Sequence, residues 1–335
     1  MEQVISNKRN IASRYFPNQN GTSAGKAILC IHGWQSRQDR MWMLAEKLNM
    51  QGYAVLTFDL SGHGASGGDI QTLSRADFLE DVVAAYDALK KESNADSIYV
   101  IGSSFGSYLA TLLSAERTVG GLVLRVPADY PDEGFSDVHI KNASSDEKFP
   151  WRNQARNFDG TRSLRALHMF QKPALIVESE LDDVTPHQCI QNYANAVTDI
   201  SLLTHTVQKH APHSLTAHPE LQNEYESIVC AWFAEISARE KKFWFKRKTY
   251  GWGWQPSTRE GWAVVLVHIL AVVIGAYVIE TYTRMLWSDI TRVSAIVGWV
   301  GVCSALLVYI AYKKGPSPRW QWGVTGDGTG AQPQL

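Results

Sequence analysis

One serine stands in a sequence setting that suits nucleophilic chemistry. Residues 102–106 read Gly-Ser-Ser-Phe-Gly, which matches the pattern G-x-S-x-G with Ser104 at its centre. Alone, this pattern also fits a plain turn of small residues. Here it follows a strand-like run and precedes a helix-like one, and the turn between them needs glycine because neighbouring backbones approach closely. We therefore expect Ser104 to present its hydroxyl above a helix N-terminus, where developing negative charge is favoured.

A nucleophilic serine needs a base, usually histidine, and the base needs a carboxylate that fixes its tautomer. Where the serine stands at such a turn, the chain order is serine, acid, histidine. Residues 174–186 read ALIVESELDDVTP, a strand followed by an acidic turn. We favour Asp182 as the acid because it lies four residues before Pro186. Asp183 stays as the alternative, and Glu178 and Glu180 are weaker candidates.

The base is expected after the next strand, in the segment VQKHAPHSLT at 207–216. His210 and His213 both qualify by type. We favour His213, which lies later in the loop and just before a helical stretch. His205 and His218 are interpreted as structural or surface residues.

Backbone amides are expected on the opposite side of the nucleophile. The segment Ile31-His32-Gly33-Trp34 ends a strand, and its turn would aim the N–H of Trp34 at Ser104. With the N–H of Phe105 it would form an oxyanion hole, in which one donor contributes about 3–4 kcal/mol in the transition state. His32 itself is interpreted as a structural turn residue.

The glycine-rich loop 59–67 lacks the features of a phosphate site. It has neither G-x-G-x-x-G spacing nor a following Lys-Ser/Thr pair. We interpret His63, within it, as part of a structural loop beside the site.

Alternating strands and helices position these residues. The predicted strands are Ala27–Ile31, Tyr53–Phe58, Ser97–Ile101, Gly121–Val126, Pro173–Val177 and Ser201–Val207, with a strand or hairpin in Val4–Phe16. The predicted helices are Asp39–Gln51, Asp77–Lys91, Phe105–Ala115 and about His218–Ala238. This order predicts an α/β fold with a mostly parallel sheet and helices on both faces. Residues 127–166 are irregular and are predicted to form a short cap insertion.

The motifs HGW at 32–34, DLSGHGASGG at 59–68, GSSFGS at 102–107, ESELDDVTP at 178–186 and HAPHSL at 210–215 occur in this order. In this respect residues 27–236 resemble the α/β-hydrolase superfamily. The resemblance implies Ser104 as nucleophile, Asp182 as acid, His213 as base, and the Trp34 and Phe105 amides as oxyanion hole. The stretch LVLRVPADYP at 122–131 is similar to a group of bacterial esterase- or peptidase-like hydrolases with a very short cap. Trp34 after Gly33 departs from the HGGG pattern of lipases.

The C-terminal part has a different character. After a hydrolase domain at 1–239, residues 240–261 form a basic linker rich in Trp and Gly. Two apolar stretches follow, at about 262–282 and 293–312, each long enough to cross a bilayer core. Residues 262–314 are therefore predicted to form two transmembrane helices, and 315–335 a disordered tail. With GWGWQPSTREGW at 251–262 and PRWQWG at 318–323, this part resembles small bacterial two-helix membrane proteins.

Positive charge sets the expected orientation. Five Lys/Arg residues lie within 241–248, and Lys313, Lys314 and Arg319 follow the second stretch, whereas the turn between the stretches holds only Arg284 and Arg292. Both termini and the hydrolase domain should therefore face the cytoplasm from a multi-pass position in the cell (inner) membrane. The N-terminus has no apolar h-region, so no secretory signal peptide is expected.

Composition narrows the function classes. The chain has 335 residues, of which 45% are hydrophobic and 19% charged, and a net charge of -1 that gives no bias toward nucleic acid. Its four cysteines have neither CxxC nor zinc spacing, so we interpret them as free thiols in a reducing compartment. No metal or organic cofactor is expected.

Together these observations predict a membrane-anchored serine hydrolase that cleaves carboxylic esters through an acyl-enzyme. Its substrate would be a small-molecule or lipid-presented acyl group. A serine peptidase or thioesterase on the same triad is the near alternative. A non-catalytic membrane-bound module that binds a partner is the alternative from another class.

Overall fold

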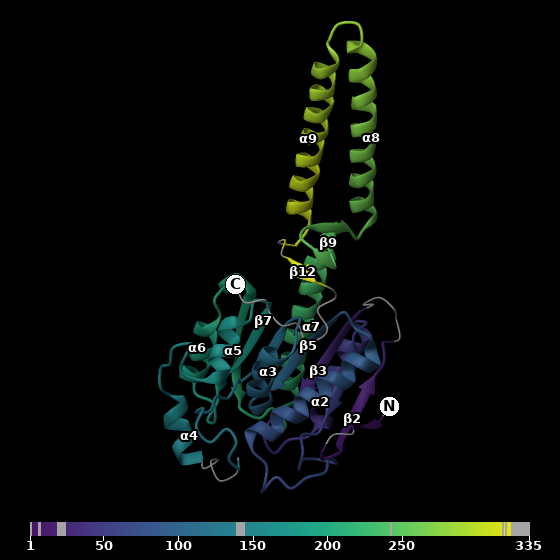
Figure 1. Ribbon diagram of the computed structural model, residues 1–335. Coiled ribbons are helices and arrows are strands. Elements are labelled where there is room, and N and C mark those ends of the chain that lie inside the picture. Colours follow the sequence, from purple (N-terminus) through teal and green to yellow (C-terminus); the bar gives the residue numbers. More distant parts are fainter. Residues whose placement is uncertain are drawn as a thin grey trace. The chain divides into compact units, whose positions relative to one another are not determined.

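The chain folds into two compact units, Met1–Phe233 and Ala234–Leu335. The computed structural model in Figure 1 describes residues 2–5, 8–18, 25–138, 145–241, 243–316, 318 and 320–322. The boundary between the units falls within a helix, slightly before the predicted end of the hydrolase domain at 239.

The first unit is built on an 8-stranded sheet with the order β1-β2-β4-β3-β5-β6-β7-β8. Neighbouring strands from β4 to β8 pair in parallel, whereas β1 and β2 form a hairpin that joins β4 in antiparallel fashion. This arrangement confirms the predicted sheet. The strands are β1 (Glu2–Ile5), β2 (Ile11–Phe16), β3 (Lys26–Ile31), β4 (Ala54–Phe58), β5 (Ser97–Ser103), β6 (Leu122–Arg125), β7 (Ala174–Leu181) and β8 (Leu203–Pro212).

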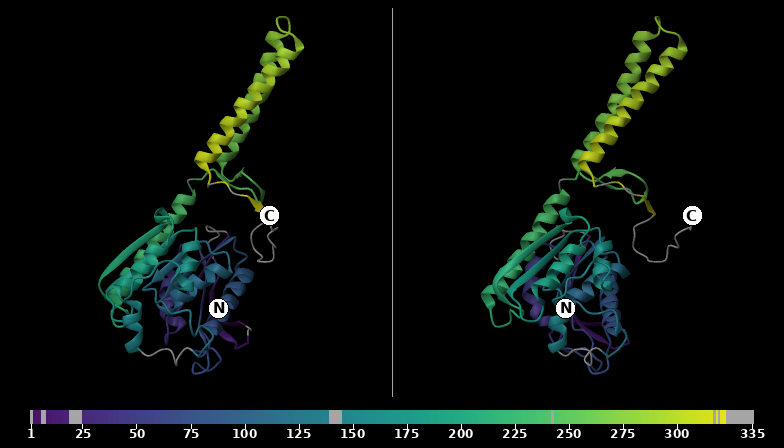
Figure 2. Two further views of the ribbon diagram at one scale, coloured as in Figure 1. Left: turned by 60° about the vertical axis from the view of Figure 1, so that its left-hand side comes forward. Right: turned by 90° about the vertical axis from the view of Figure 1, so that its left-hand side faces the viewer.

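Helices cover both faces of this sheet, as Figure 2 shows from two sides. One apolar core packs α2, α3, α5 and α6 against one face, and α1 and α7 lie on the other, where Lys47 of α1 pairs with Glu226 of α7 at 2.6 Å. Because both faces are buried, β3 and β4 are apolar along almost their whole length. The helices are α1 (Trp42–Met50), α2 (Arg75–Ser93), α3 (Phe105–Glu116), α4 (Ser145–Arg152), α5 (Arg162–Met169), α6 (His187–Ala196) and α7 (Pro219–Lys241), with 3-10 helices η1 (Gln38–Met41) and η3 (Ile200–Leu202).

The region 127–166 is less irregular than predicted. It contains α4 and the start of α5, which packs against α3 and so belongs to the helical layer of the sheet. The expectation of an irregular insertion was wrong for these helices: α4 has few apolar residues and includes Pro150, and only the first part of α5 falls inside the region. Residues 139–144 of the predicted cap lie outside the described part of the chain.

The second unit contains two long helices, α8 (Arg259–Thr283) and α9 (Asp289–Lys314). Both are long and apolar enough to cross a membrane, by length and composition. Each begins at a capping residue, because Thr258 accepts from Gly261 N and Ser288 accepts from Thr291 N. They extend the predicted stretches 262–282 and 293–312 by between one and four residues at each end.

Trp299 links the two helices in their middle. Its indole Nε1 donates to the carbonyl oxygen of Ala271 at 2.9 Å. The ring lies over Gly275, where a Cβ atom would overlap it. A glycine at this position therefore provides the space in which the indole packs.

The predicted linker 240–261 instead forms short strands. β9 (Phe245–Arg247) pairs with β11 (Trp254–Pro256), and β10 (Tyr250–Gly251) pairs with β12 (Gln321–Trp322). We call β9 to β12 the platform. Contacts at this platform hold the C-terminal end of α9, because Trp244 N donates to Lys314 O at 2.7 Å and Trp254 Nε1 donates to Pro316 O at 2.7 Å. Near the start of α8, Gly261 lies against the carbonyl oxygen of Trp244.

The platform also corrects the predicted tail. Gln321 and Trp322 are part of a strand rather than disordered. Residues 323–335 lie outside the described residues.

Substituting Gly275 with alanine should loosen the helix pair, because the new methyl group would displace Trp299 and break its hydrogen bond. Gly298 is the matched control, since a Cβ there meets nothing within 4 Å. In detergent micelles we expect the unfolding midpoint of the helix pair to fall for Gly275→Ala, by a destabilisation of about 1–3 kcal/mol, and to stay unchanged for Gly298→Ala. Equal midpoints for the two variants would contradict this packing.

Candidate active site

The serine of the G-x-S-x-G motif sits in a strained turn between β5 and α3. Ser104 has φ 53° and ψ -113°, a conformation that costs a non-glycine residue about 1–3 kcal/mol. The turn is held from both sides: Ser104 N donates to Arg125 O at 2.9 Å, and Gly106 lies against β3, where a Cβ would lie 2.6 Å from His32 O. The surrounding backbone therefore imposes the strain, and the side chain stands at the carboxyl edge of the sheet.

The imidazole of His213 meets this hydroxyl. Its Nε2 lies 3.0 Å from Ser104 Oγ, and its Nδ1 lies 2.7 Å from Asp182 Oδ2. The Asp182 carboxylate is 4% exposed and the His213 side chain 19% exposed, so one end of the array is buried and the other reaches solvent.

The acid is itself oriented by its own loop. Asp182 Oδ1 accepts from the backbone amides of Val184 at 2.8 Å and Thr185 at 2.6 Å. These bonds fix the carboxylate plane before it meets the imidazole.

Strand register explains why acid and base are adjacent. Leu181 at the end of β7 pairs with Pro212 at the end of β8, across an irregularity between Ser179 and Leu181. The next residues along each strand are Asp182 and His213. The parallel sheet thus delivers both side chains to one edge, although they are 31 residues apart in sequence.

The alternative candidates lie elsewhere. Asp183 is exposed, and the His210 side chain is 86% exposed beside Glu180. Glu178 binds His187 and His205 instead of His213. The structure thus brings together Ser104, Asp182 and His213, and it keeps Asp183, His210, Glu178, Glu180, His205 and His218 in other contacts or at the surface.

The segment after β3 borders the other side of the serine. A Cβ on Gly33 would lie 3.5 Å from Ser104 Cβ and 3.1 Å from Ser103 O, so this backbone runs directly past the nucleophile. Trp34 follows, and its indole packs edge to face on Phe105, the first residue of α3, at 5.6 Å between ring centroids. The two residues expected to supply oxyanion amides therefore flank Ser104.

Two histidines hold this segment in place. His32 Nδ1 donates to Gly33 O at 2.7 Å while its Nε2 accepts from Leu60 N at 3.0 Å. His63 Nε2 accepts from Gln35 N at 3.1 Å while its Nδ1 donates to Ser61 O. Each ring uses one nitrogen as donor and the other as acceptor, which only a neutral imidazole can do. Both serve as the structural residues that the sequence indicated.

The burial of His32 and His63 favours the neutral form of both rings. It lowers the pKa of His32 from 6.5 to about 4, and it also lowers the pKa of His63. The segment that carries Gly33 and Trp34 thus keeps its hydrogen bonds at neutral pH.

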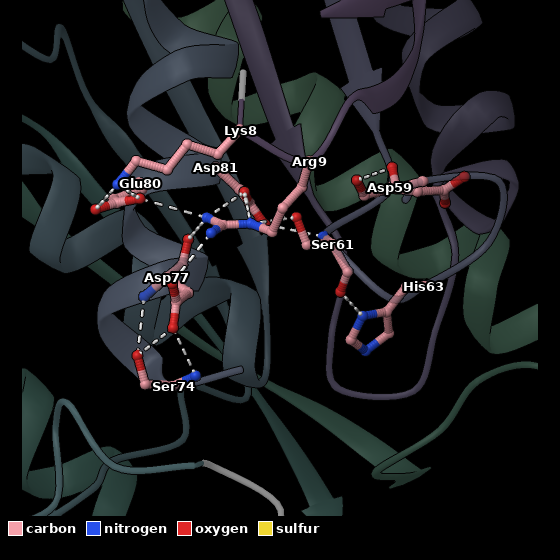
Figure 3. A network of polar contacts seen from close by, with 10 residues as sticks. Lys8, Arg9, Asp59, Ser61, His63, Ser74, Asp77, Glu80 and Asp81 are labelled. Atoms are coloured by element: carbon pink, nitrogen blue, oxygen red, sulfur yellow. Dashed lines mark hydrogen bonds and ion pairs between the residues drawn. The ribbon is translucent and has the colours of Figure 1, made fainter. Parts of the chain in front are cut away.

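A polar network ties the loop of His63 to the N-terminal hairpin (Figure 3). Arg9, in the turn between β1 and β2, binds Asp81 of α2 at 3.0 Å and donates to Ser61 Oγ at 2.9 Å. Asp81 in turn accepts from Ser61 N at 2.9 Å, and Asp77 accepts from Arg9 at 3.0 Å. The hairpin therefore fixes the loop that orients the Trp34 segment.

Arg125, the last residue of β6, was not singled out from the sequence. Its guanidinium donates to His213 O at 2.9 Å, next to the array. In the sequence, this residue stands out only as a charged residue inside the apolar run LVLRV. Such a run indicates that the charge is buried, but not which groups bind it.

The array has the parts needed for acyl transfer. A hydroxyl lies within hydrogen-bond distance of an imidazole, the imidazole binds a buried carboxylate, and the backbone of Gly33 runs past the serine. Among the residues described, no three His, Cys, Asp or Glu side chains group in a way that holds a metal ion.

The buried His32 should make stability depend on pH. Between pH 6.5 and about pH 4 the unfolded chain binds a proton at this residue and the folded chain does not. Stability should therefore fall as pH falls through this window, by up to about 3 kcal/mol from this residue. Denaturant unfolding at pH 7 and pH 5 measures the slope.

We expect a shallower slope for His32→Gln than for the wild type, and an unchanged slope for His218→Gln, whose side chain is 44% exposed. The same slope in all three proteins would exclude His32 as the source.

Part of the chain is similar to known hydrolases and acyl transferases. Residues 22–145 match the model of the serine aminopeptidase S33 family. The chain is 27% identical over 124 residues to an acyl transferase of Photobacterium phosphoreum, covering 36% of this chain and 40% of that protein. It is 31% identical over 110 residues to human monoglyceride lipase, covering 32% of this chain and 36% of that one. The chain thus spans less than half the length of these curated relatives.

The fold has a wider match among solved structures. Est1E from Butyrivibrio proteoclasticus, in complex with ferulic acid, superposes with a TM-score of 0.57 at 20% identity, over 70% of this chain and 99% of that one. With the sheet order and the strained serine turn, this likeness shows that the chain has the α/β-hydrolase fold.

Proposed function

We propose that this chain is a serine hydrolase that cleaves carboxylic esters through an acyl-enzyme. The observation that carries the proposal is the continuous array in which Ser104 Oγ lies 3.0 Å from His213 Nε2 and His213 Nδ1 lies 2.7 Å from Asp182. An imidazole between a hydroxyl and a carboxylate can take the hydroxyl proton, because the carboxylate stabilises the imidazolium that results.

The proposed reaction has two halves. Ser104 Oγ attacks the acyl carbon while its proton moves to His213 Nε2, and the oxyanion is stabilised by the amides of Trp34 and Phe105. His213 then protonates the leaving alcohol, which departs and leaves an ester on Ser104. Water loses a proton to His213 and attacks this ester, and His213 returns that proton to Ser104 Oγ as the acid leaves.

The names of the relatives favour esters as the substrate class. They include a monoglyceride lipase, a carboxylesterase of Bacillus subtilis and a solved complex with ferulic acid. The match to the serine aminopeptidase family keeps amides as a second class to be tested. Because one fold hosts many reactions, the site and not the fold carries this proposal.

A fluorophosphonate probe tests the nucleophile. We expect labelling of the wild type and of Ser114→Ala, which changes a serine further along α3, and no labelling of Ser104→Ala. Two pairs of variants test the acid and the base. Asp182→Asn is compared with its control Asp183→Asn, and His213→Gln with its control His210→Gln. Only the first of each pair should lose activity, by about 10⁴-fold.

A panel of p-nitrophenyl esters and aminoacyl amides gives the substrate class. Labelling of Ser104→Ala would overturn the proposal. Absence of labelling and turnover, with a partner protein still captured by Ser104→Ala, would favour the non-catalytic binding module.

We further propose that α8 and α9 anchor the chain in a bacterial inner membrane, with both termini in the cytoplasm. The apolar side chains of the two helices are exposed to the surroundings, which suits a hydrocarbon medium. Lys246, Arg247 and Lys248 of the platform region lie at the end that also carries Lys313 and Lys314. This excess of positive charge over the opposite turn favours the cytoplasmic side.

The platform suits the headgroup layer. Its exposed aromatic side chains, Tyr250, Trp252 and Trp320, are 68%, 52% and 63% exposed, and such rings are enriched at membrane interfaces. The nearby lysines would add about 1 kcal/mol each toward anionic lipid.

Cysteine accessibility in bacterial cells tests this topology. In a Cys230→Ser background we expect a membrane-impermeant maleimide to label Met285→Cys, in the turn between the helices, from the periplasm. Lys248→Cys should react only after the inner membrane is opened. The reverse pattern would invert the orientation, and release of the chain by alkaline carbonate would exclude the anchor.

A further inference from the structure

Arg125 is a buried cation placed between the strands that carry the proposed triad. It is the last residue of β6 and is 6% exposed. Its Nη1 donates to His213 O at 2.9 Å, and its Nη2 donates to Ser179 Oγ at 3.2 Å and to Pro212 O at 3.4 Å. One side chain therefore binds both β7 and the residues at the end of β8.

The same residue holds the nucleophile through its backbone. Arg125 O accepts from Ser104 N at 2.9 Å and from Ser107 Oγ at 2.9 Å. Its Nη1 also lies 3.5 Å from Ser103 Oγ. The strained turn and the base are thus tied to one residue, one through the carbonyl group and the other through the guanidinium.

Burial of this charge is costly. Its strongest contacts are neutral carbonyl and hydroxyl oxygens, and its Nε–H has no partner among the described residues. Burial lowers the pKa of Arg125, opposed by attraction to Tyr225 and Asp182. A buried cation held mainly by neutral groups costs several kcal/mol, so stability alone does not explain it.

The shape of the side chain does explain it. A guanidinium presents donors in a rigid planar fork, which bridges several acceptors at fixed angles, whereas a lysine ammonium is a single point on a flexible stem. The fork here spans the His213 carbonyl and the Ser179 hydroxyl. It therefore determines where the loop that carries His213 begins.

We propose that Arg125 is a positioning residue for the acyl transfer. Its guanidinium binds the backbone carbonyl of His213 while its own carbonyl binds the amide of Ser104, and this keeps the Ser104 hydroxyl within hydrogen-bond distance of the His213 imidazole. This inference rests on the proposed serine hydrolase function. The side chain acts through His213 and does not touch the reacting atoms.

The test compares Arg125→Met with Arg75→Met in the full chain, solubilised in detergent. Arg75 is the matched control because it is also buried, at 2% exposure, and donates to the carbonyls of Pro131 and Glu133, both at 2.6 Å. Both variants should lower the melting temperature. Only Arg125→Met should lower kcat for a p-nitrophenyl ester, by about 100-fold with KM nearly unchanged, because a displacement of about 1 Å costs this much.

The rate of fluorophosphonate labelling should fall in parallel, and Arg125→Lys should recover part of kcat because it restores a charge and one donor. If Arg125→Met does not fold, Arg125→Lys carries the test, with kcat expected about tenfold below wild type.

Wild-type kcat in either folded Arg125 variant, or equal losses in Arg125→Met and Arg75→Met, would overturn the inference. A wild type that no probe labels would overturn the proposed function and this inference with it, whereas normal labelling of all variants would overturn this inference alone.

Discussion

The close approach of Gly106 to the end of β3 is the contact on which the site depends. With hydrogen as its side chain, Gly106 allows the first turn of α3 to lie against the carbonyl oxygens of Ile31 and His32. This contact holds Ser104 in its strained conformation and brings the segment of Gly33 and Trp34 past the same hydroxyl. Any larger residue at this position would move Ser104 away from the segment of Gly33 and Trp34, because the backbone atoms that it would meet cannot yield as a flexible side chain can.

Strand pairing then completes the array from distant parts of the chain. The parallel order places the ends of β3, β5, β7 and β8 at one edge of the sheet, where loops rather than strands carry the chemistry. The pairing of Leu181 with Pro212 decides which loop residues meet. A slip of one residue would turn Asp182 and His213 to opposite faces. The triad geometry is therefore a property of register as much as of residue type.

Local patterns explain which parts were predictable from the sequence. The serine turn, the strands and the two long apolar helices follow from short-range spacing, and the structure confirms these elements. The pairing that brings Asp182 to His213 depends on an irregularity between β7 and β8, in which Ser179 to Leu181 lies opposite the longer stretch Gln208 to Pro212, and this has no local signature. The helix α4 carries few apolar residues, and the platform strands are only two or three residues long. Arg125 was missed because its partners are distant in sequence, and nothing in LVLRV indicates them.

Three buried or half-buried histidines border this site, and their partners distinguish them. His32 and His63 each accept a backbone N–H on one nitrogen, and a backbone amide cannot give up its proton, so these rings must stay neutral to keep their bonds. His213 faces a hydroxyl on one side and a carboxylate on the other, a pair that tolerates both the neutral and the charged ring. The proton transfer that we propose therefore falls to the one of these three histidines whose partners allow its proton count to change, while the other two hold the segment of Gly33 and Trp34 in place.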